Sequence, residues 1–212
     1  MKQKIKAAIG RTHIIETAIR EFGQHSYESS SINRICSSGG ISKGKLYHYF
    51  ESKEQLYYEA IKYCFGLLSD LYDTFSVDAD LNLEENILDF FKLRQVFWLE
   101  NMDITDFLAK ARGELPENLK LKISDLRSDF TTSRYKPSLA KIFSHFFPDN
   151  IELQNRLTEM TWIAIDYTAV GIGLPNYTQA QGITDLLSKQ LESFSAIIRI
   201  FLYGCFPQDK TQ

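Results

Sequence analysis

The 212-residue sequence lacks the long apolar runs and the cysteine pairs that mark membrane proteins and secreted disulfide-linked domains. No stretch of about 18 apolar residues is free of charge, so we expect no membrane span. The basic N-terminus is not followed by an apolar core with a small-residue cleavage site, which argues against a secretory signal. Cys36, Cys64 and Cys205 are odd in number and far apart, which fits buried thiols in a reducing cytoplasm.

Motifs that assemble catalytic or metal sites are also missing. No His-x-x-x-His, Cys-x-x-Cys or Gly-x-Ser-x-Gly pattern occurs, and the histidines are scattered. Cys64 lies in an apolar helical stretch with no histidine near it in sequence. We therefore expect neither an enzyme nor a cofactor or metal site.

Alternating β-branched stretches are absent, and the spacing of apolar residues predicts an all-α fold of about nine helices. Pro137 is expected to break or restart the long helix that begins at Pro116, and GIGLPNY, residues 171–177, predicts a loop. The other helices are predicted at about residues 3–22, 31–38, 43–50, 53–75, 83–100, 103–112, 150–170 and 179–203.

Charge is distributed unevenly along the chain. Residues 1–53 hold nine Lys/Arg and four Asp/Glu, a balance of +5, while the remainder holds 15 against 23, a balance of −8. A basic head on an acidic body suggests that only the head meets a polyanion, although a charge run is more often a solvated face.

The segment GGISKGKLYHYF, residues 39–50, resembles two different motifs. Gly39, Gly44 and Lys45 nearly form a phosphate-binding loop, which must follow a buried strand and end in a Ser or Thr that holds magnesium. The preceding residues are polar with a helical apolar face, and Leu46 stands at the magnesium position. The sequence therefore argues against a nucleotide hydrolase.

The same segment meets the requirements of a helix-turn-helix. A short capped helix is followed by the turn Gly39-Gly40-Ile41, in which Ile41 plugs the angle between two helices. The second helix, capped by Ser42, exposes residues that suit phosphates and base edges: Lys43, Gly44, Lys45, Tyr47 and His48.

The stretch SINRICSSGGISKGKLYHYFESKEQLYYEAI resembles the N-terminal signature of the TetR family of bacterial transcriptional regulators. The resemblance covers residues 5 to about 61, whereas the body resembles the family only in helical content and length. Lys45 replaces a usual Thr or Ala and adds a cation. The resemblance implies a helix-turn-helix DNA-binding domain at residues 1–50. It implies a helical domain for effector binding and dimerisation at residues 51–212.

The resemblance also implies DNA contacts residue by residue. Ser30 would bond a phosphate through its hydroxyl and backbone amide, and Lys53 would bind phosphate at the start of the fourth helix. Lys43 and Lys45 would touch phosphate or guanine. For Tyr47 and Tyr49 the alternative is core packing. The expected DNA-binding set is Ser30, Ser42, Lys43, Gly44, Lys45, Tyr47, His48 and Lys53.

The body is rich in aromatic side chains on several predicted helices. Aromatic walls with a few charges describe a pocket for a flat or hydrophobic molecule, and the alternative is an ordinary Phe-rich core. Arg94 and Asp166 could orient a polar group, or pair with each other. The candidate ligand-binding residues are Phe65, Leu68, Tyr72, Phe90, Arg94, Phe97, Trp98, Phe107, Trp162 and Asp166.

The last two predicted helices carry apolar stripes wider than one neighbour requires, with Phe194 or Ile198 expected to face a partner. Such helices can form a four-helix interface across a two-fold axis, or both faces can be buried within one protomer. We expect a repressor that binds a double-stranded DNA operator as a homodimer and is released by a small effector. The alternative is a DNA-binding regulator or architectural protein without an effector.

Overall fold

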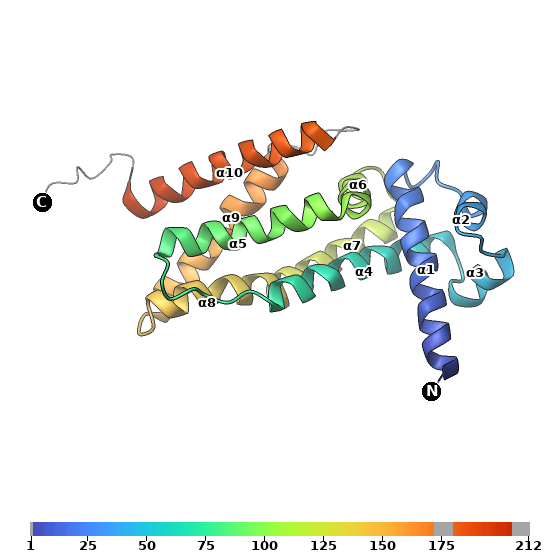
Figure 1. Ribbon diagram of the computed structural model, residues 1–212, viewed down its shortest axis with the longest axis horizontal. Helices are drawn as coiled ribbons and strands as arrows, with labels where there is room; N and C mark the ends of the chain where they lie inside the picture. The colour runs from blue at the N-terminus through green and yellow to red at the C-terminus, as the bar shows by residue number, and fades with distance from the viewer. Residues whose placement is uncertain (1, 172–179, 205–212) are drawn as a thin grey trace, which may run out of the picture. The chain divides into compact units, whose positions relative to one another are not determined.

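The computed structural model describes residues 2–171 and 180–204, and every regular element in them is helical, so the predicted all-α fold is confirmed (Figure 1). Cys205 and most of the predicted loop at 171–177 lie outside the described residues. If the continuous run from α7 to α8 is counted as one helix, the described residues form nine. The elements are α1 (Lys2–Gln24), α2 (Ile32–Ser38), α3 (Lys43–Tyr49), α4 (Lys53–Asp73), α5 (Leu83–Glu100), α6 (Met102–Lys110), α7 (Glu117–Phe130), the π-helix η1 (Thr131–Tyr135), α8 (Lys136–Phe146), α9 (Ile151–Gly171) and α10 (Ala180–Tyr203).

The chain divides into two compact units that do not coincide with the domains expected from the sequence. The first unit comprises Met1–Asp70 and Asn101–Phe130, and the second comprises Leu71–Glu100 and Thr131–Gln212. Helices α1 to α3 thus share a compact unit with most of α4 and with α6 and α7. The functional division near residue 50 stays a prediction.

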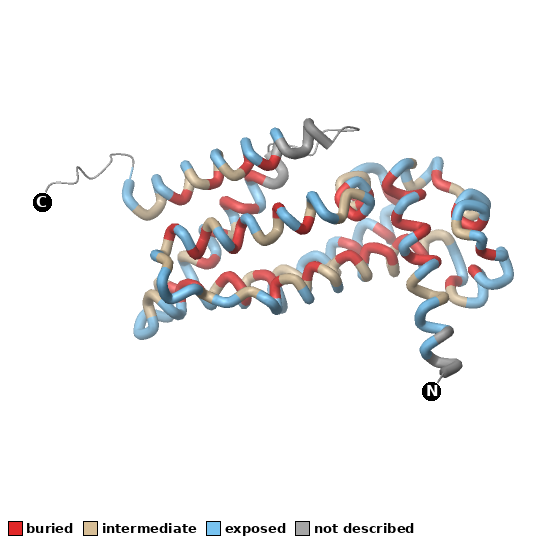
Figure 2. Tube along the Cα trace, in the orientation of Figure 1, coloured by how far each residue is buried: buried red, intermediate tan, exposed pale blue. Residues whose placement is uncertain are grey.

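The first unit is built around the apolar face of α1. Ile14, Ala18 and Phe22 follow one another at helical spacing and are buried, and the burial pattern can be followed along the chain in Figure 2. The Phe22 ring lies 4.7 Å from that of Tyr57 and 5.7 Å from that of Phe107, measured between centroids. These contacts tie α1, α4 and α6 into one core.

Pro137 does not end the long helix, because a π-helical turn precedes it. The turn covers Thr131–Tyr135, and Pro137 lies in the first turn of α8. A proline removes the hydrogen bond to the carbonyl four residues earlier and crowds it. The wider π turn accommodates this loss without interrupting the helical run.

The second unit contains α5, α8, α9 and α10, and Figure 1 shows α10 lying along α5. The Gln95 side chain donates to the Leu187 carbonyl at 2.8 Å, and the Phe194 ring stacks on Phe91 with 4.1 Å between centroids. Phe194 and Ile198 are buried here. The expectation that one of them faces a partner is therefore wrong, because this face of α10 packs inside the protomer.

Cys36 and Cys64 are both buried free thiols. Burial raises the pKa of the Cys64 thiol to about 12, so it stays protonated and unreactive. Among the described residues, no helix is both long enough and apolar enough to cross a membrane.

Gly40, in the turn between α2 and α3, has a φ of 60°, which lies in the left-handed region. Gly40→Ala should lower the free energy of unfolding by about 1 kcal/mol, because a Cβ is strained there. Gly66→Ala is the matched control: Gly66 lies inside α4, where an added Cβ meets nothing within 4 Å. Alanine should raise stability there by roughly 0.5–1 kcal/mol. Urea unfolding of both variants checks the opposite signs, and equal effects would contradict the turn geometry.

Candidate functional site

The turn between α2 and α3 is fixed by close packing. Ile41 is buried, and its amide donates to the Cys36 carbonyl at 2.8 Å. A Cβ on Gly39 would lie only 2.6 Å from the Ile41 side chain, so the glycine makes room for it. A ring nitrogen of His13 on α1 lies 2.9 Å from the Gly39 carbonyl oxygen. The predicted role of Ile41 as a plug is confirmed.

Helix α3 presents a polar face to solvent around a single buried anchor, Leu46. The Ser42 hydroxyl caps the helix by accepting from the Lys45 amide at 3.2 Å. Tyr47 is 51% exposed, which favours the predicted surface role over core packing. The other predicted contacts on this face are exposed as well: Lys43, Gly44, Lys45 and His48.

Lys45 is exposed but does not extend freely into solvent. A Cβ added to Gly10 would lie 3.5 Å from the Lys45 Cε and 3.5 Å from the Tyr49 hydroxyl. Helix α3 therefore packs closely against α1 at Gly10, and the ammonium of Lys45 lies beside α1.

Ser30 and Lys53 are already engaged inside the first unit. The Ser30 hydroxyl donates to the Tyr27 carbonyl at 2.6 Å, and its amide donates to the Ser26 carbonyl at 2.9 Å. The Lys53 ammonium donates to the carbonyls of Ser30 at 3.1 Å and Glu28 at 3.4 Å, and it lies 4.6 Å from the centre of the Tyr27 ring. Their phosphate contacts stay predictions, and each would require these bonds to be exchanged for bonds to DNA.

Burial lowers the pKa of the Lys53 ammonium, and the charges of Glu28 and Glu21 oppose that shift. The lysine is thus partly withdrawn from water, and it connects the start of α4 to the loop before α2. This loop fixes where α2 begins.

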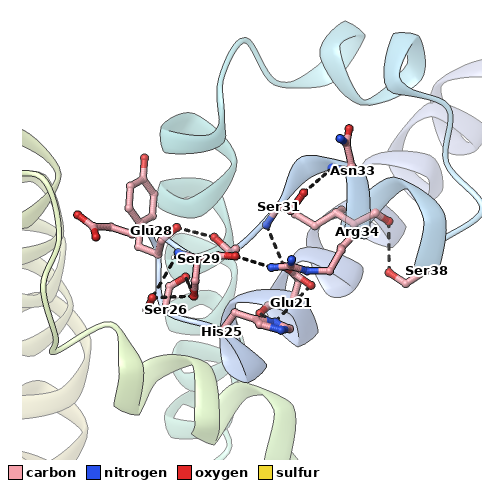
Figure 3. A network of polar contacts seen from close by, with 12 residues as sticks. Glu21, His25, Ser26, Glu28, Ser29, Ser31, Asn33, Arg34 and Ser38 are labelled. Atoms are coloured by element: carbon pink, nitrogen blue, oxygen red, sulfur yellow. Dashed lines mark hydrogen bonds and ion pairs between the residues drawn. The ribbon is translucent and has the colours of Figure 1, made fainter.

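A buried carboxylate holds the same loop from α1. Glu21 accepts from the Ser31 amide at 2.9 Å and from the Arg34 Nε at 2.8 Å, and the Arg34 guanidinium also donates to the Ser29 carbonyl (Figure 3). The Ser31 hydroxyl in turn caps α2 by accepting from the Asn33 amide at 3.2 Å. Glu21 therefore positions the first of the two helices of the motif.

Sequence reasoning missed Glu21, Arg34 and His13. Glu21 lies three residues after Ala18, on the buried face of α1, and a charge on an apolar face signals a paired group. Nothing in the sequence identifies Arg34 as its partner, because the two residues are 13 positions apart on different helices. Ser31 rather than Ser30 caps α2, and two adjacent serines do not distinguish the cap.

Three of the candidate ligand-binding residues in the second unit, Tyr72, Phe90 and Arg94, lie in or beside an aromatic cluster around Tyr72. The Tyr72 ring stacks on Phe90 with 5.2 Å between centroids, and it meets Tyr135 edge-on at 4.8 Å. Burial raises the pKa of both hydroxyls, against the opposing charge of Arg94. Arg94 lies 5.3 Å from the Phe91 ring centre, and its buried Nε has no hydrogen-bond acceptor among the described residues.

The remaining candidates in the second unit have other surroundings. Phe97 is buried and Trp98 is half-buried. The Lys136 ammonium lies over the Trp162 ring, 4.4 Å from its centre, and also forms an ion pair with Glu159 at 2.7 Å. Asp166 is exposed.

Three candidates belong to the first unit. Phe107 lies in its core against Phe22 and Tyr57. Phe65 is half-buried and stacks on Phe130 at 5.0 Å, and Leu68 is buried. Ligand contact by these residues stays a prediction.

The chain is similar to known bacterial regulators. Residues 14–60 match the family described as bacterial regulatory proteins, tetR family. The sequence is 26% identical to the biofilm operon icaADBC HTH-type negative transcriptional regulator IcaR of Staphylococcus aureus over 145 residues, 65% of this chain and 69% of that protein. It is 36% identical to the probable acrEF/envCD operon repressor of Escherichia coli over 58 residues, 27% of this chain and 26% of that protein.

Solved structures share the fold over most of the chain. The transcriptional regulator FadR from Bacillus subtilis, in complex with stearoyl-CoA, matches with a TM-score of 0.64 and 15% identity, over 92% of this chain and 99% of that one. A regulator of the TerR/AcrR family from Aquifex aeolicus VF5 matches with a TM-score of 0.58 and 18% identity, over 89% and 99%. At these identities the likeness concerns the fold alone.

The contacts of Glu21 predict that the free energy of unfolding depends on pH. Burial raises the pKa of Glu21, but bonds from Arg34 and the Ser31 amide, with the nearby charges of His25 and Arg34, outweigh burial and lower it below its ordinary value of 4.5. The ionised carboxylate therefore stabilises the fold above that value, and this contribution is lost as the pH falls through the lower folded-state pKa.

Glu21→Gln should remove this part of the acid dependence. Free energies of unfolding measured in urea between about pH 7 and pH 3 should fall less steeply for the variant than for the unmodified chain. Glu152→Gln, which alters an exposed ion pair with Arg156, is the control and should keep most of the original slope. Parallel curves for the unmodified chain and Glu21→Gln would contradict the assignment.

Proposed function

We propose that the chain, whose residues 14–60 match the tetR family of bacterial regulatory proteins, is a repressor that binds its DNA operator as a homodimer and is released by a small hydrophobic effector. The observation that carries the proposal is the exposed polar face of α3, on a helix that is capped by Ser42 and anchored by Leu46. A second copy of that helix would read the other half of a pseudo-palindrome, with half-sites about 34–36 Å apart or a little more. Bound over a promoter, such a dimer blocks polymerase.

The exposed apolar residues of α9 and α10 support the homodimer. Met160, Ile163 and Tyr167 recur at helical spacing on one side of α9 and are exposed in the protomer, as are Ile200 and Tyr203 on α10. Because the opposite side of α10 is occupied by α5, these are the faces that a partner would cover. Two helices from each protomer would then form a four-helix interface.

The aromatic cluster of the second unit supports a hydrophobic effector. The Arg94 Nε, buried without an acceptor among the described residues, is a donor that a polar group of the effector would satisfy. The similar structure from Bacillus subtilis is in complex with stearoyl-CoA, which supports the proposal that this fold can bind a molecule with a long apolar chain. Helix α4 carries Lys53 at its first residue and Tyr72 near its end, so an effector that displaces Tyr72 would tilt an element that also holds the DNA-binding helices.

The double variant Lys43→Ala/Lys45→Ala tests DNA binding. The wild-type chain should bind an operator duplex selected from a random-sequence pool, and the variant should bind it more weakly. The slope of log affinity against log salt should fall by about two, since each lysine neutralises about one phosphate. Lys120→Ala/Lys122→Ala, on α7, removes the same charge and should leave the slope unchanged. Unaltered affinity in the α3 variant would refute the assignment of α3.

Ile163→Glu tests the dimer. A charge at the centre of the exposed α9 stripe should leave monomers at micromolar concentration, where the unmodified chain sediments as a dimer, because an unpaired carboxylate would be buried in the interface. Ile151→Glu is the matched control, since Ile151 is similarly exposed but lies on the other side of α9. A monomeric wild-type chain in analytical ultracentrifugation would refute the proposal.

Arg94→Met tests the effector site. Among hydrophobic acids, alcohols and amines screened by thermal shift, at least one should stabilise the free chain and release the operator. An effector that binds the free form about 100-fold better than the DNA-bound form contributes about 2.7 kcal/mol per site. Arg94→Met should weaken that ligand about ten-fold by removing a polar contact, with operator affinity unchanged. Lys92→Met, in the exposed pair with Asp89 on the same helix, is the control. A panel with no effect on stability or release would favour a regulator without an effector.

A further inference from the structure

A shallow groove of about 430 Å³ lies between α1 and α2 in the first unit, outside the predicted contacts of α3. Its lining includes two guanidinium groups, those of Arg20 and Arg34, together with His25 and the hydroxyl-bearing residues Ser37 and Ser38. Cationic and hydrogen-bonding side chains around an open groove of this size suit an oxyanion such as a phosphate group.

Arg34 is held in place before any ligand arrives. Its Nε and one terminal nitrogen bind Glu21, at 2.8 Å and 2.7 Å, and the same terminal nitrogen donates to the Ser29 carbonyl (Figure 3). The Glu21 side chain is only 7% exposed, so its position is fixed by the core of the unit. A guanidinium carries five N–H donors, and those on the other terminal nitrogen make no hydrogen bond within the described part of the chain.

The orientation of Arg34 matches what phosphate recognition requires. Its side chain is 47% exposed even though one edge is fully engaged, so the other edge faces water. A free arginine loses much rotational freedom when it binds an anion, and Glu21 has already removed that freedom during folding. The carboxylate of Glu21 balances the positive charge of Arg34. The guanidinium of Arg20 therefore gives the groove a net positive charge.

We propose that this groove binds a phosphate group of the DNA backbone, with Arg34 as the contacting residue and Glu21 as its positioning residue. The DNA backbone is the source because Arg34 is bonded to the segment at residues 29–31. The family resemblance implies a phosphate contact for Ser30 in that segment, and the Ser31 amide shares the Glu21 acceptor with Arg34. The proposal rests on the DNA binding proposed above and extends it beyond α3 to a second helix.

Arg34→Ala tests the contact. Binding to the selected operator should weaken about ten-fold or more, and the salt slope should fall by about one. A residue that merely supports α2 would lower the affinity and the melting temperature without changing the slope. Arg156→Ala, which breaks an Arg–Glu pair in the second unit whose two side chains are exposed, is the control and should change neither.

The double variant Glu21→Gln/Arg34→Ala separates a phosphate contact from simple neutralisation of Glu21. If Arg34 binds phosphate, the double variant stays weak and keeps the reduced slope, because the donor is still missing. Recovery of the original affinity and slope would overturn the proposal, since the arginine would then serve only to balance a buried charge. Arg34→Lys keeps the positive charge but loses the planar, two-pronged set of N–H donors of the guanidinium. It should keep most of the salt slope but bind the operator more weakly.

Inorganic phosphate distinguishes the backbone from a free anion as the source. In thermal shift at constant ionic strength, millimolar phosphate should stabilise the unmodified chain no more than it stabilises Arg34→Ala. Stabilisation that requires Arg34, with an unchanged operator affinity in Arg34→Ala, would overturn the DNA assignment in favour of a free phosphate ligand. Failure of the unmodified chain to bind any duplex would instead refute the proposed function, which the Arg34 variants do not test.

Discussion

The two helices that form the predicted DNA-reading motif are only seven residues long, and they depend on α1 for their shape. Isolated helices of that length are unstable in water, so tertiary contacts must hold them. Helix α1 supplies these contacts at three levels: Glu21 at the start of α2, His13 at the turn, and Gly10 beneath Lys45 and Tyr49 of α3. The buried carboxylate is the most demanding of the three, because a charge without its donors could not remain in the core.

Much of the fold could be predicted because it follows from local patterns. Apolar spacing located the helices, and Ser42 and Ile41 could be placed because the cap and the plug have fixed positions in the motif. The first helix, predicted to end near residue 22, continues through Gly23 to Gln24. A Cβ at Gly23 would lie 3.2 Å from the Asp103 carbonyl oxygen, so the glycine instead admits the close approach of α6.

What the sequence did not reveal depends on contacts between distant segments. The width of the apolar stripe on α10 showed correctly that much of the helix is covered, but not that α5 covers Phe194. Likewise, the family resemblance implied phosphate contacts for Ser30 and Lys53, but it did not show that both are bonded within the protein. Side chains on two different helices make such pairs, and no one-dimensional pattern assigns the partners.

The engagement of Lys53 by backbone carbonyls has a consequence for how the chain would search DNA. Arg11 is likewise paired with Glu59 at 2.5 Å, and Arg34 with Glu21, so several cations of the basic head are already balanced. The excess of +5 in residues 1–53 already counts Glu21 but not Glu59, which pairs with Arg11, so the attraction to an arbitrary duplex is weaker than that excess suggests. With fewer counterions released at each random site, a protein of this kind dwells there briefly and moves on quickly. Cations that are already bonded within the protein thus favour rapid movement along DNA over tight non-specific binding.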